Sequence, residues 1–82
     1  MPKPRTESGE KNLVGARLKE LRKRDSLSQR DLAYRFQLIG VDMDKNVITW
    51  IETNKRYVTD LELRAIAAIF NVSYKYLIDG EE

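Results

Sequence analysis

Short polar motifs that begin helices recur along the chain, and no strand-like alternation of apolar and polar residues lies between them. Ser28-Gln29-Arg30-Asp31 and Thr59-Asp60-Leu61-Glu62 are capping boxes, in which the first hydroxyl and the fourth carboxylate bond backbone N–H groups at a helix N-terminus. Asn12, Asp44 and Ser73 each stand where an N-cap is expected before a run with helical spacing. These signals predict an all-α chain of five helices.

Apolar residues follow each start at the spacing of one helical face. In the first helix, expected over about 13–24, Val14, Leu18 and Leu21 recur at i, i+4 and i+7. The later helices carry, in turn, Leu32, Ala33 and Phe36; Val47, Ile48 and Ile51; Leu63, Ile66, Ala67 and Phe70 together with Leu61, Ala65, Ala68 and Ile69; and Leu77 with Ile78. Because the fourth helix is apolar on two stripes, we expect it to be central.

A chain of 82 residues makes one domain, and a domain of this size buries only about 60% of its unfolded surface. The first 11 residues combine two prolines, a glycine and scattered charge, which predicts a flexible arm. The folded domain is expected over 12–80, with 81–82 as the end of an acidic tail. No apolar segment has the length of a membrane span or the form of a signal peptide, so we expect a cytoplasmic protein.

The chain contains no Cys and no His. Their absence removes disulfides, thiolate and imidazole metal ligands, and the common nucleophile and base pairs. We therefore expect no enzyme, no cofactor and no metal site. Asp42-Met43-Asp44-Lys45-Asn46 opens like a calcium loop, but Val47 replaces the required Gly and Thr53 the final Glu, so this interpretation is rejected.

Positive charge is concentrated in the first part of the chain. Residues 1–35 hold ten Lys/Arg against five Asp/Glu, whereas 36–82 hold five against eight. Lys19, Arg22, Lys23 and Arg24 form a cluster at the end of the first helix, which suits either a phosphate-facing surface or an ordinary solvated face.

These motifs together give a family likeness. From Leu13 to Gly80 the chain resembles the lambda-repressor-like, Cro/C1-type (XRE family) helix-turn-helix domains. The resemblance is carried by Leu18-Lys19-Glu20-Leu21-Arg22, Leu27-Ser28-Gln29-Arg30-Asp31-Leu32-Ala33, Ile48-Thr49-Trp50-Ile51-Glu52, Ile66-Ala67 with Phe70, and Asn71-Val72-Ser73 with Leu77. It implies a compact five-helix DNA-binding domain.

Two departures from the family pattern concern backbone turns. The segment 37–43 makes the connection between the second and third helices about five residues longer than usual, and its extra apolar residues either lengthen the second helix or pack under the turn. Gly40 supplies its flexible point. Asn54 replaces the Gly that commonly follows the third helix, and we expect it to adopt the same left-handed conformation.

The resemblance implies that the third helix, about 45–53, reads bases in the major groove. Lys45, Asn46 and Trp50 match base-contacting positions, and Thr49 lies beside them. Asn46 can bond an adenine edge through two hydrogen bonds, and Lys45 a guanine edge or a phosphate. Trp50 lies nearly opposite Ile48 on the helix, which favours an exposed ring over a core position.

Other positions are expected to hold the DNA backbone or the fold. Gln29 is placed at a helix N-terminus, where free N–H groups bind anions, and the resemblance implies both a phosphate contact and a brace for the third helix. Lys55, Arg56 and Tyr57 are expected to make a second backbone contact, with ordinary loop charge as the alternative. Arg22 and Glu52 occupy positions that the family uses for an ion pair between the first and third helices.

We therefore expect a sequence-specific regulator that binds double-stranded DNA, most simply a small repressor. The alternative is a protein-interaction or antitoxin-type module on the same fold. A homodimer through the last helix is also expected, because Tyr74, Tyr76 and Ile78, with Val58 or Ile69 nearby, offer more apolar surface than this helix needs for its own packing.

Overall fold

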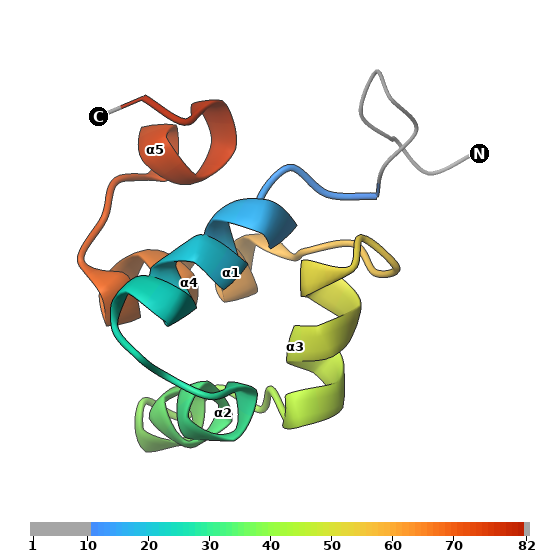
Figure 1. The fold of residues 1–82 in the computed structure, drawn as a ribbon, viewed down its shortest axis with the longest axis vertical. Coiled ribbons are helices and arrows are strands. Elements are labelled where there is room, and N and C mark those ends of the chain that lie inside the picture. Colours follow the sequence, from blue (N-terminus) through green and yellow to red (C-terminus); the bar gives the residue numbers. More distant parts are fainter. Residues whose placement is uncertain (1–10, 82) are drawn as a thin grey trace.

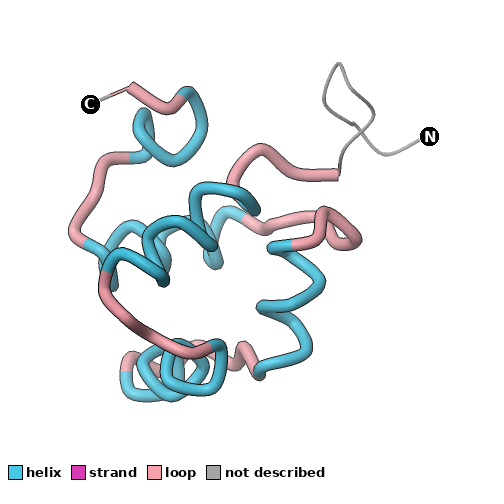
Figure 2. The backbone as a smooth tube through the Cα atoms, viewed as in Figure 1, coloured by secondary structure: helices cyan, strands magenta, loops and turns pink. Residues whose placement is uncertain are grey.

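Five helices make up the part of the chain that the structure, a computed structural model, describes, residues 11–81. Their bounds are α1 Gly15–Arg24, α2 Gln29–Leu38, α3 Lys45–Glu52, α4 Asp60–Phe70 and α5 Tyr74–Asp79. Within these residues every ordered element is a helix and the rest is loop (Figure 2). The helices α2 and α3 lie at one end of the molecule and α5 lies at the other, with α1 and α4 between them (Figure 1). The predicted all-α fold is confirmed, whereas most of the predicted arm, 1–10, and the last residue lie outside the described residues.

The helix starts follow the predicted capping motifs. Ser28 and Asp31 form a reciprocal capping box at α2, and Thr59 and Glu62 form one at α4. The side chains of Asp44 and Ser73 accept the backbone N–H groups of Val47 and Tyr76. The first helix differs from the prediction, because it begins at Gly15 and not near residue 13, with Val14 as its N-cap. Asn12 lies outside the helix, although its Oδ1 still accepts the Gly15 N–H at 2.8 Å.

The ends of α1, α2 and α3 share one backbone motif. After each helix a residue with positive φ donates its N–H three residues back, and the next residue donates five residues back. This is the Schellman arrangement, which satisfies carbonyls that the helix leaves free. The residues with positive φ are Ser26, Gly40 and Asn54, at 56°, 79° and 60°. The left-handed conformation predicted for Asn54 is confirmed, and Gly40 has the positive φ that Gly adopts readily.

A single core fills the space between the helices. Its largest fully buried side chains are Leu18, Leu21, Leu32, Phe36, Ile48, Ile51, Ile66 and Leu77. At its edge, the backbones of α1 and α3 approach so closely that a Cβ on Gly15 would collide with the Ile51 carbonyl. Gly15 therefore fixes how α1 lies on the end of α3, the helix that carries the predicted base contacts.

The connection between α2 and α3 is shorter than predicted. It spans 39–44 because α2 continues through Gln37 to Leu38. Val41 and Met43 pack on the core under the turn, whereas Leu38 and Ile39 point outward and are exposed. The extra residues therefore both lengthen α2 and pack under the turn, as predicted. They also leave an exposed apolar edge, which was not predicted.

The fourth helix is less central than its sequence suggested. Ala65, Ile66, Ala67 and Phe70 are buried, but Leu61 and Ala68, which belong to its second apolar stripe, are exposed. The helix packs against α2 and α5. One side of it remains at the surface, continuous with the exposed turn after α2.

Candidate nucleic-acid interface

The third helix has a buried apolar face and an exposed polar face. Ile48 and Ile51 are completely buried. Lys45, Asn46 and Trp50 lie on the other side, and Trp50 is 48% exposed. The exposed position predicted for Trp50 is thus present. An α-helix with its side chains is about 10–12 Å across, which fits the major groove of B-DNA, about 12 Å wide.

An ion pair fastens this helix to α1. Glu52 Oε2 accepts Arg22 Nε at 2.8 Å, and Glu52 Oε1 accepts Arg22 Nη2 at 3.0 Å. Only 12% of the Arg22 side chain and 3% of the Glu52 side chain are exposed. The same guanidinium donates from Nη1 to the Leu27 carbonyl at 2.9 Å, so the pair also holds the loop before α2. The hydrogen bonds to Glu52 raise the pKa of Arg22 and keep it charged. The structure therefore contains the predicted pairing.

The side chain of Gln29 braces α2 against α3. Its Nε2 donates to Glu52 Oε1 at 3.2 Å, and its Oε1 accepts the Thr49 hydroxyl at 2.9 Å. The Thr49 hydroxyl also lies 3.0 Å from the Lys45 carbonyl. Because Thr49 has a single hydroxyl proton and both neighbours are acceptors, that proton is used inside the protein. Gln29 keeps one amide N–H for a partner outside the protein.

An open hollow lies where the N-termini of α2 and α3 meet. It is lined by Arg22, Ser28, Gln29, Arg30 and Lys45. Arg30 and Lys45 are exposed there, so two cations flank the predicted anion-binding end of α2. Sequence reasoning did not select Arg30. Its position one residue after Gln29 in the same first helical turn was the available signal.

The segment after α3 uses its charges unequally. Arg56 Nη1 donates to Glu62 Oε1 at 2.7 Å and to the Tyr57 carbonyl at 3.1 Å. Lys55 is exposed, and Tyr57 is half-buried beneath the Lys11 ammonium, 5.9 Å from the ring centre. Arg56 thus holds the loop after α3 against α4. This differs from the predicted role of Arg56 as a cation facing phosphate.

The side chain of Asn12, which the sequence predicted only as a helix cap, joins three segments of the chain. Asn12 Nδ2 donates to the Ile51 carbonyl at 3.1 Å and to the Arg56 carbonyl at 2.9 Å, while its Oδ1 holds the start of α1. Asn12 is 7% exposed. It therefore fixes the loop that carries Lys55 to the end of α3.

The basic cluster at the end of α1 does not act as a single surface. Arg22 is committed to Glu52, and Arg24 pairs with Asp25 at 2.9 Å. Lys19 and Lys23 are exposed. Over residues 11–81, the acidic side chains form no group of three or more suited to a metal ion. Among the helices of that segment, none has the length and apolarity needed to span a membrane.

Two helices in this arrangement, with the second braced on the first and exposing a polar face, define a helix-turn-helix unit. A family model described as "Helix-turn-helix domain" matches residues 15–82. The chain therefore belongs to the helix-turn-helix domain family, consistent with its resemblance to Cro/C1-type domains. Searches of curated proteins and of solved structures returned no match.

Proposed function

We propose that this domain binds double-stranded DNA at specific sequences and acts as a small transcriptional repressor, with α3 in the major groove. The observation that carries the proposal is the exposed polar face of α3, supported from behind by Ile48 and Ile51 and held by the Arg22, Glu52 and Gln29 network. A reading helix needs this support, because base recognition depends on side chains held in a fixed position. Repression then requires only that the bound domain exclude other proteins from the same DNA.

The proposed base contacts come from Lys45, Asn46 and Trp50. Asn46 is exposed and can bond an adenine edge through two hydrogen bonds, while Trp50 offers apolar contact to a thymine methyl or a sugar. Thr49 contributes its methyl group or its oxygen lone pairs, since its proton is engaged by Gln29 or Lys45.

The proposed phosphate contacts flank α3 on two sides. On the first side, Gln29 and Arg30 contact a phosphate from the N-terminus of α2. On the second side, Lys55 and Tyr57 contact a phosphate from the loop after α3. Arg56 positions that loop through Glu62. Charged phosphate contacts make binding dependent on salt, whereas a Gln contact does not.

We further propose a homodimer through the C-terminal face, formed by Leu13, Val58, Leu63 and Ile78, with Tyr74 at the surface of α5. The four aliphatic side chains line one open hollow. Tyr74 is exposed, but Tyr76 packs on the core, so we expect Tyr76 to contribute less than first predicted. Ile69 does not belong to this face, because it lines a different hollow beside α2.

The function is tested on duplexes selected from a random pool, by fluorescence anisotropy on selected and scrambled sequences at several salt concentrations. Asn46→Ala should cost about 1 to 3 kcal/mol on the selected site and little on scrambled DNA, because one base contact is lost. Lys55→Ala should weaken both, with the slope of log affinity against log salt reduced by about one. An unchanged affinity ratio for Asn46→Ala would favour the alternative, a protein-interaction or antitoxin-type module.

A further inference from the structure

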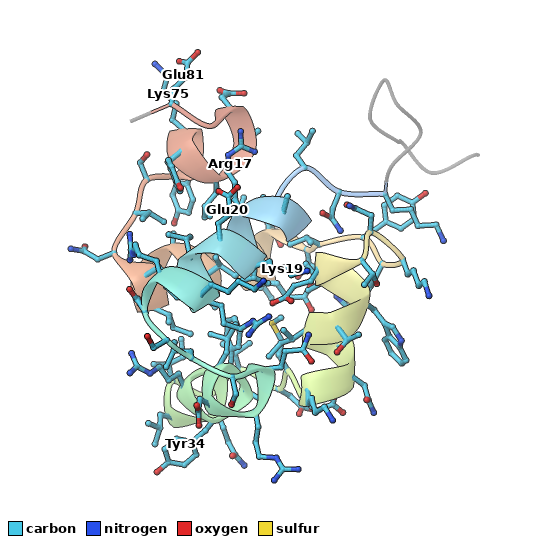
Figure 3. The ribbon with its side chains drawn as sticks, in the orientation of Figure 1. Arg17, Lys19, Glu20, Tyr34, Lys75 and Glu81 are labelled. Carbon is cyan, nitrogen blue, oxygen red and sulfur yellow. The ribbon has the colours of Figure 1, made fainter. Side chains whose placement is uncertain are left out.

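An exposed apolar surface lies on the outer side of α2 and α4, away from the polar face of α3. We name it the turn patch, after the connection that follows α2. Its members are Tyr34, Leu38, Ile39, Leu61 and Ile69. The first four are each more than half exposed, and Ile69 is partly buried. Tyr34 projects from α2 away from the other helices (Figure 3). These four are half of the eight large apolar side chains that are exposed within residues 11–81.

The members form one surface. One open hollow is lined by Leu27, Tyr34, Leu38, Ile39 and Ile69, and a neighbouring one by Ile39, Leu61 and Ala68. Ile39 is a wall of both, so the two hollows adjoin at this residue. The patch therefore runs from the outer side of α2, across the turn, to the outer side of α4.

Of the patch members only Ile69 also packs on the core, and the fold does not require apolar residues at the four exposed positions. The turn is already fixed by the positive φ of Gly40 and by Val41 and Met43, which pack on the core. Leu38 and Ile39 could both be polar without loss of core contact. A contiguous apolar patch that the core does not use is typical of a protein interaction surface.

Charges of both signs border the patch. Asp31 and Arg35 line its α2 half, and Asp42 and Arg64 line its α4 half together with Glu62, whose charge is paired with Arg56. A partner that carries only negative charge, such as DNA or an acidic helix, would meet the negative charge of Asp31 on one half and of Asp42 on the other. A two-fold contact brings each half against a half with both signs, so every Arg can face an Asp of the second copy.

We propose that the turn patch binds the turn patch of a second copy of this chain. The largest apolar patches on monomeric proteins measure roughly 300–600 Å², and four large side chains more than half exposed are of that size. With its charged border the surface approaches the roughly 800 Å² that each partner buries in a standard interface. Leu38 lies at the opposite end of α2 from Gln29, about 13 Å away along the helix axis. A contact centred on Leu38 and Ile39 therefore lies away from Gln29, and within the patch Tyr34 comes nearest to the proposed phosphate contacts, because it shares a hollow with Arg30.

The test measures self-association without DNA, so that its result does not depend on the proposed function. Sedimentation equilibrium is run on the full chain carrying Ile78→Ser, which removes a central contact of the C-terminal face and leaves the turn patch intact. This variant should be in concentration-dependent equilibrium between monomer and dimer. Adding Leu38→Ser and Ile39→Ser should raise the dimer dissociation constant at least tenfold, because both side chains lose their apolar contact.

Circular dichroism confirms that each variant is folded, as expected for substitutions of exposed or half-exposed residues. Gln37→Ser, an exposed substitution beside Leu38, is the matched control and should leave the dissociation constant unchanged. The proposal is overturned if the Ile78→Ser chain remains monomeric at every concentration up to the millimolar range. It is equally overturned if the chain with all three substitutions associates as strongly as Ile78→Ser alone. Affinity for a single DNA half-site, measured on the same variants, tests the proposed function separately.

Discussion

Glu52 shows how a single side chain links the fold to the proposed reading surface. Its two oxygens accept three hydrogen bonds, two from Arg22 and one from Gln29. A carboxylate that is 3% exposed is costly unless it is paired, and its pairing leaves Arg22 equally dependent on it. The two charges stabilise the orientation of α3 chiefly because neither can be removed alone.

Removing either charge should therefore destabilise the domain strongly. We expect Arg22→Ala and Glu52→Ala each to lower the free energy of unfolding by about 3 to 5 kcal/mol, because each leaves a buried charge without its partner. Chemical denaturation measures the loss. Arg24→Ala is the matched control, since its pair with Asp25 is exposed and should contribute little to stability. Losses below about 0.5 kcal/mol for both variants would show that the buried pair is incidental.

Residues whose roles depend on one helix were predictable, and residues whose roles depend on distant partners were not. The exposure of Trp50 follows from helical phase alone. The role of Asn12 depends on carbonyls 39 and 44 residues away, and that of Arg56 depends on the position of α4. No local pattern contains those distances. The Arg22 and Glu52 pair spans 30 residues and was predicted only because a family resemblance supplied it.

Element boundaries divide in the same way. The starts of α2, α3, α4 and α5 were predictable because a cap is a local hydrogen bond between residues two or three apart, whereas α1 has no side-chain cap and begins two residues later than predicted. The end of α1 at Arg24 was also predicted, but the left-handed residue that follows it, Ser26, was not, because Ser carries no preference for positive φ comparable to that of Gly or Asn. A longer α2 was one of the two uses expected for the extra residues, and its last turn contains Gln37 and Leu38, which are good helix formers.

The capping box of α4 makes the stability of this element depend on pH. Burial acts to raise the pKa of Glu62, but hydrogen bonds from Arg56 and from the Thr59 backbone outweigh it, and the pKa is lowered from 4.5. A carboxylate with a depressed folded pKa stabilises the folded state above its unfolded pKa. That contribution is lost as the pH falls through the folded pKa.

Glu62→Gln should thus reduce stability at neutral pH by about 1.5 kcal/mol, the lower end for a hydrogen bond to a charged group. The amide still caps Thr59, so the difference from the wild type reports the charge. It should shrink as the pH falls from 5 towards 3, measured by urea unfolding at each pH. Asp60→Asn, an exposed change in the same helical turn, should stay within about 0.5 kcal/mol. A difference that stays constant over this range would contradict the assignment.

At the scale of the whole molecule, the described part of this domain presents three surfaces with different chemistry. The α3 face is polar, the C-terminal face is apolar around the start of α1 and the end of α5, and the turn patch is apolar with charges of both signs. One small module buries a limited area on DNA. Pairing through a face that leaves α3 free doubles that area, and this is the physical reason to expect the C-terminal face to join two copies on one operator.

A homodimer built in this way should read two half-sites whose centres are about 34 Å apart, one turn of B-DNA. We expect two chains per selected duplex at saturation for the chain carrying Leu38→Ser and Ile39→Ser, which cannot pair through the turn patch, measured by sedimentation velocity with labelled DNA. Ile78→Ser should weaken binding to the full site at least tenfold, about 1.4 kcal/mol, with affinity for an isolated half-site unchanged. Inserting five base pairs between the half-sites rotates them to opposite sides of the helix and should cause a similar loss for the wild type. A stoichiometry of one chain per duplex at saturation would rule out the dimer, and the selected sequence should then lack two-fold symmetry.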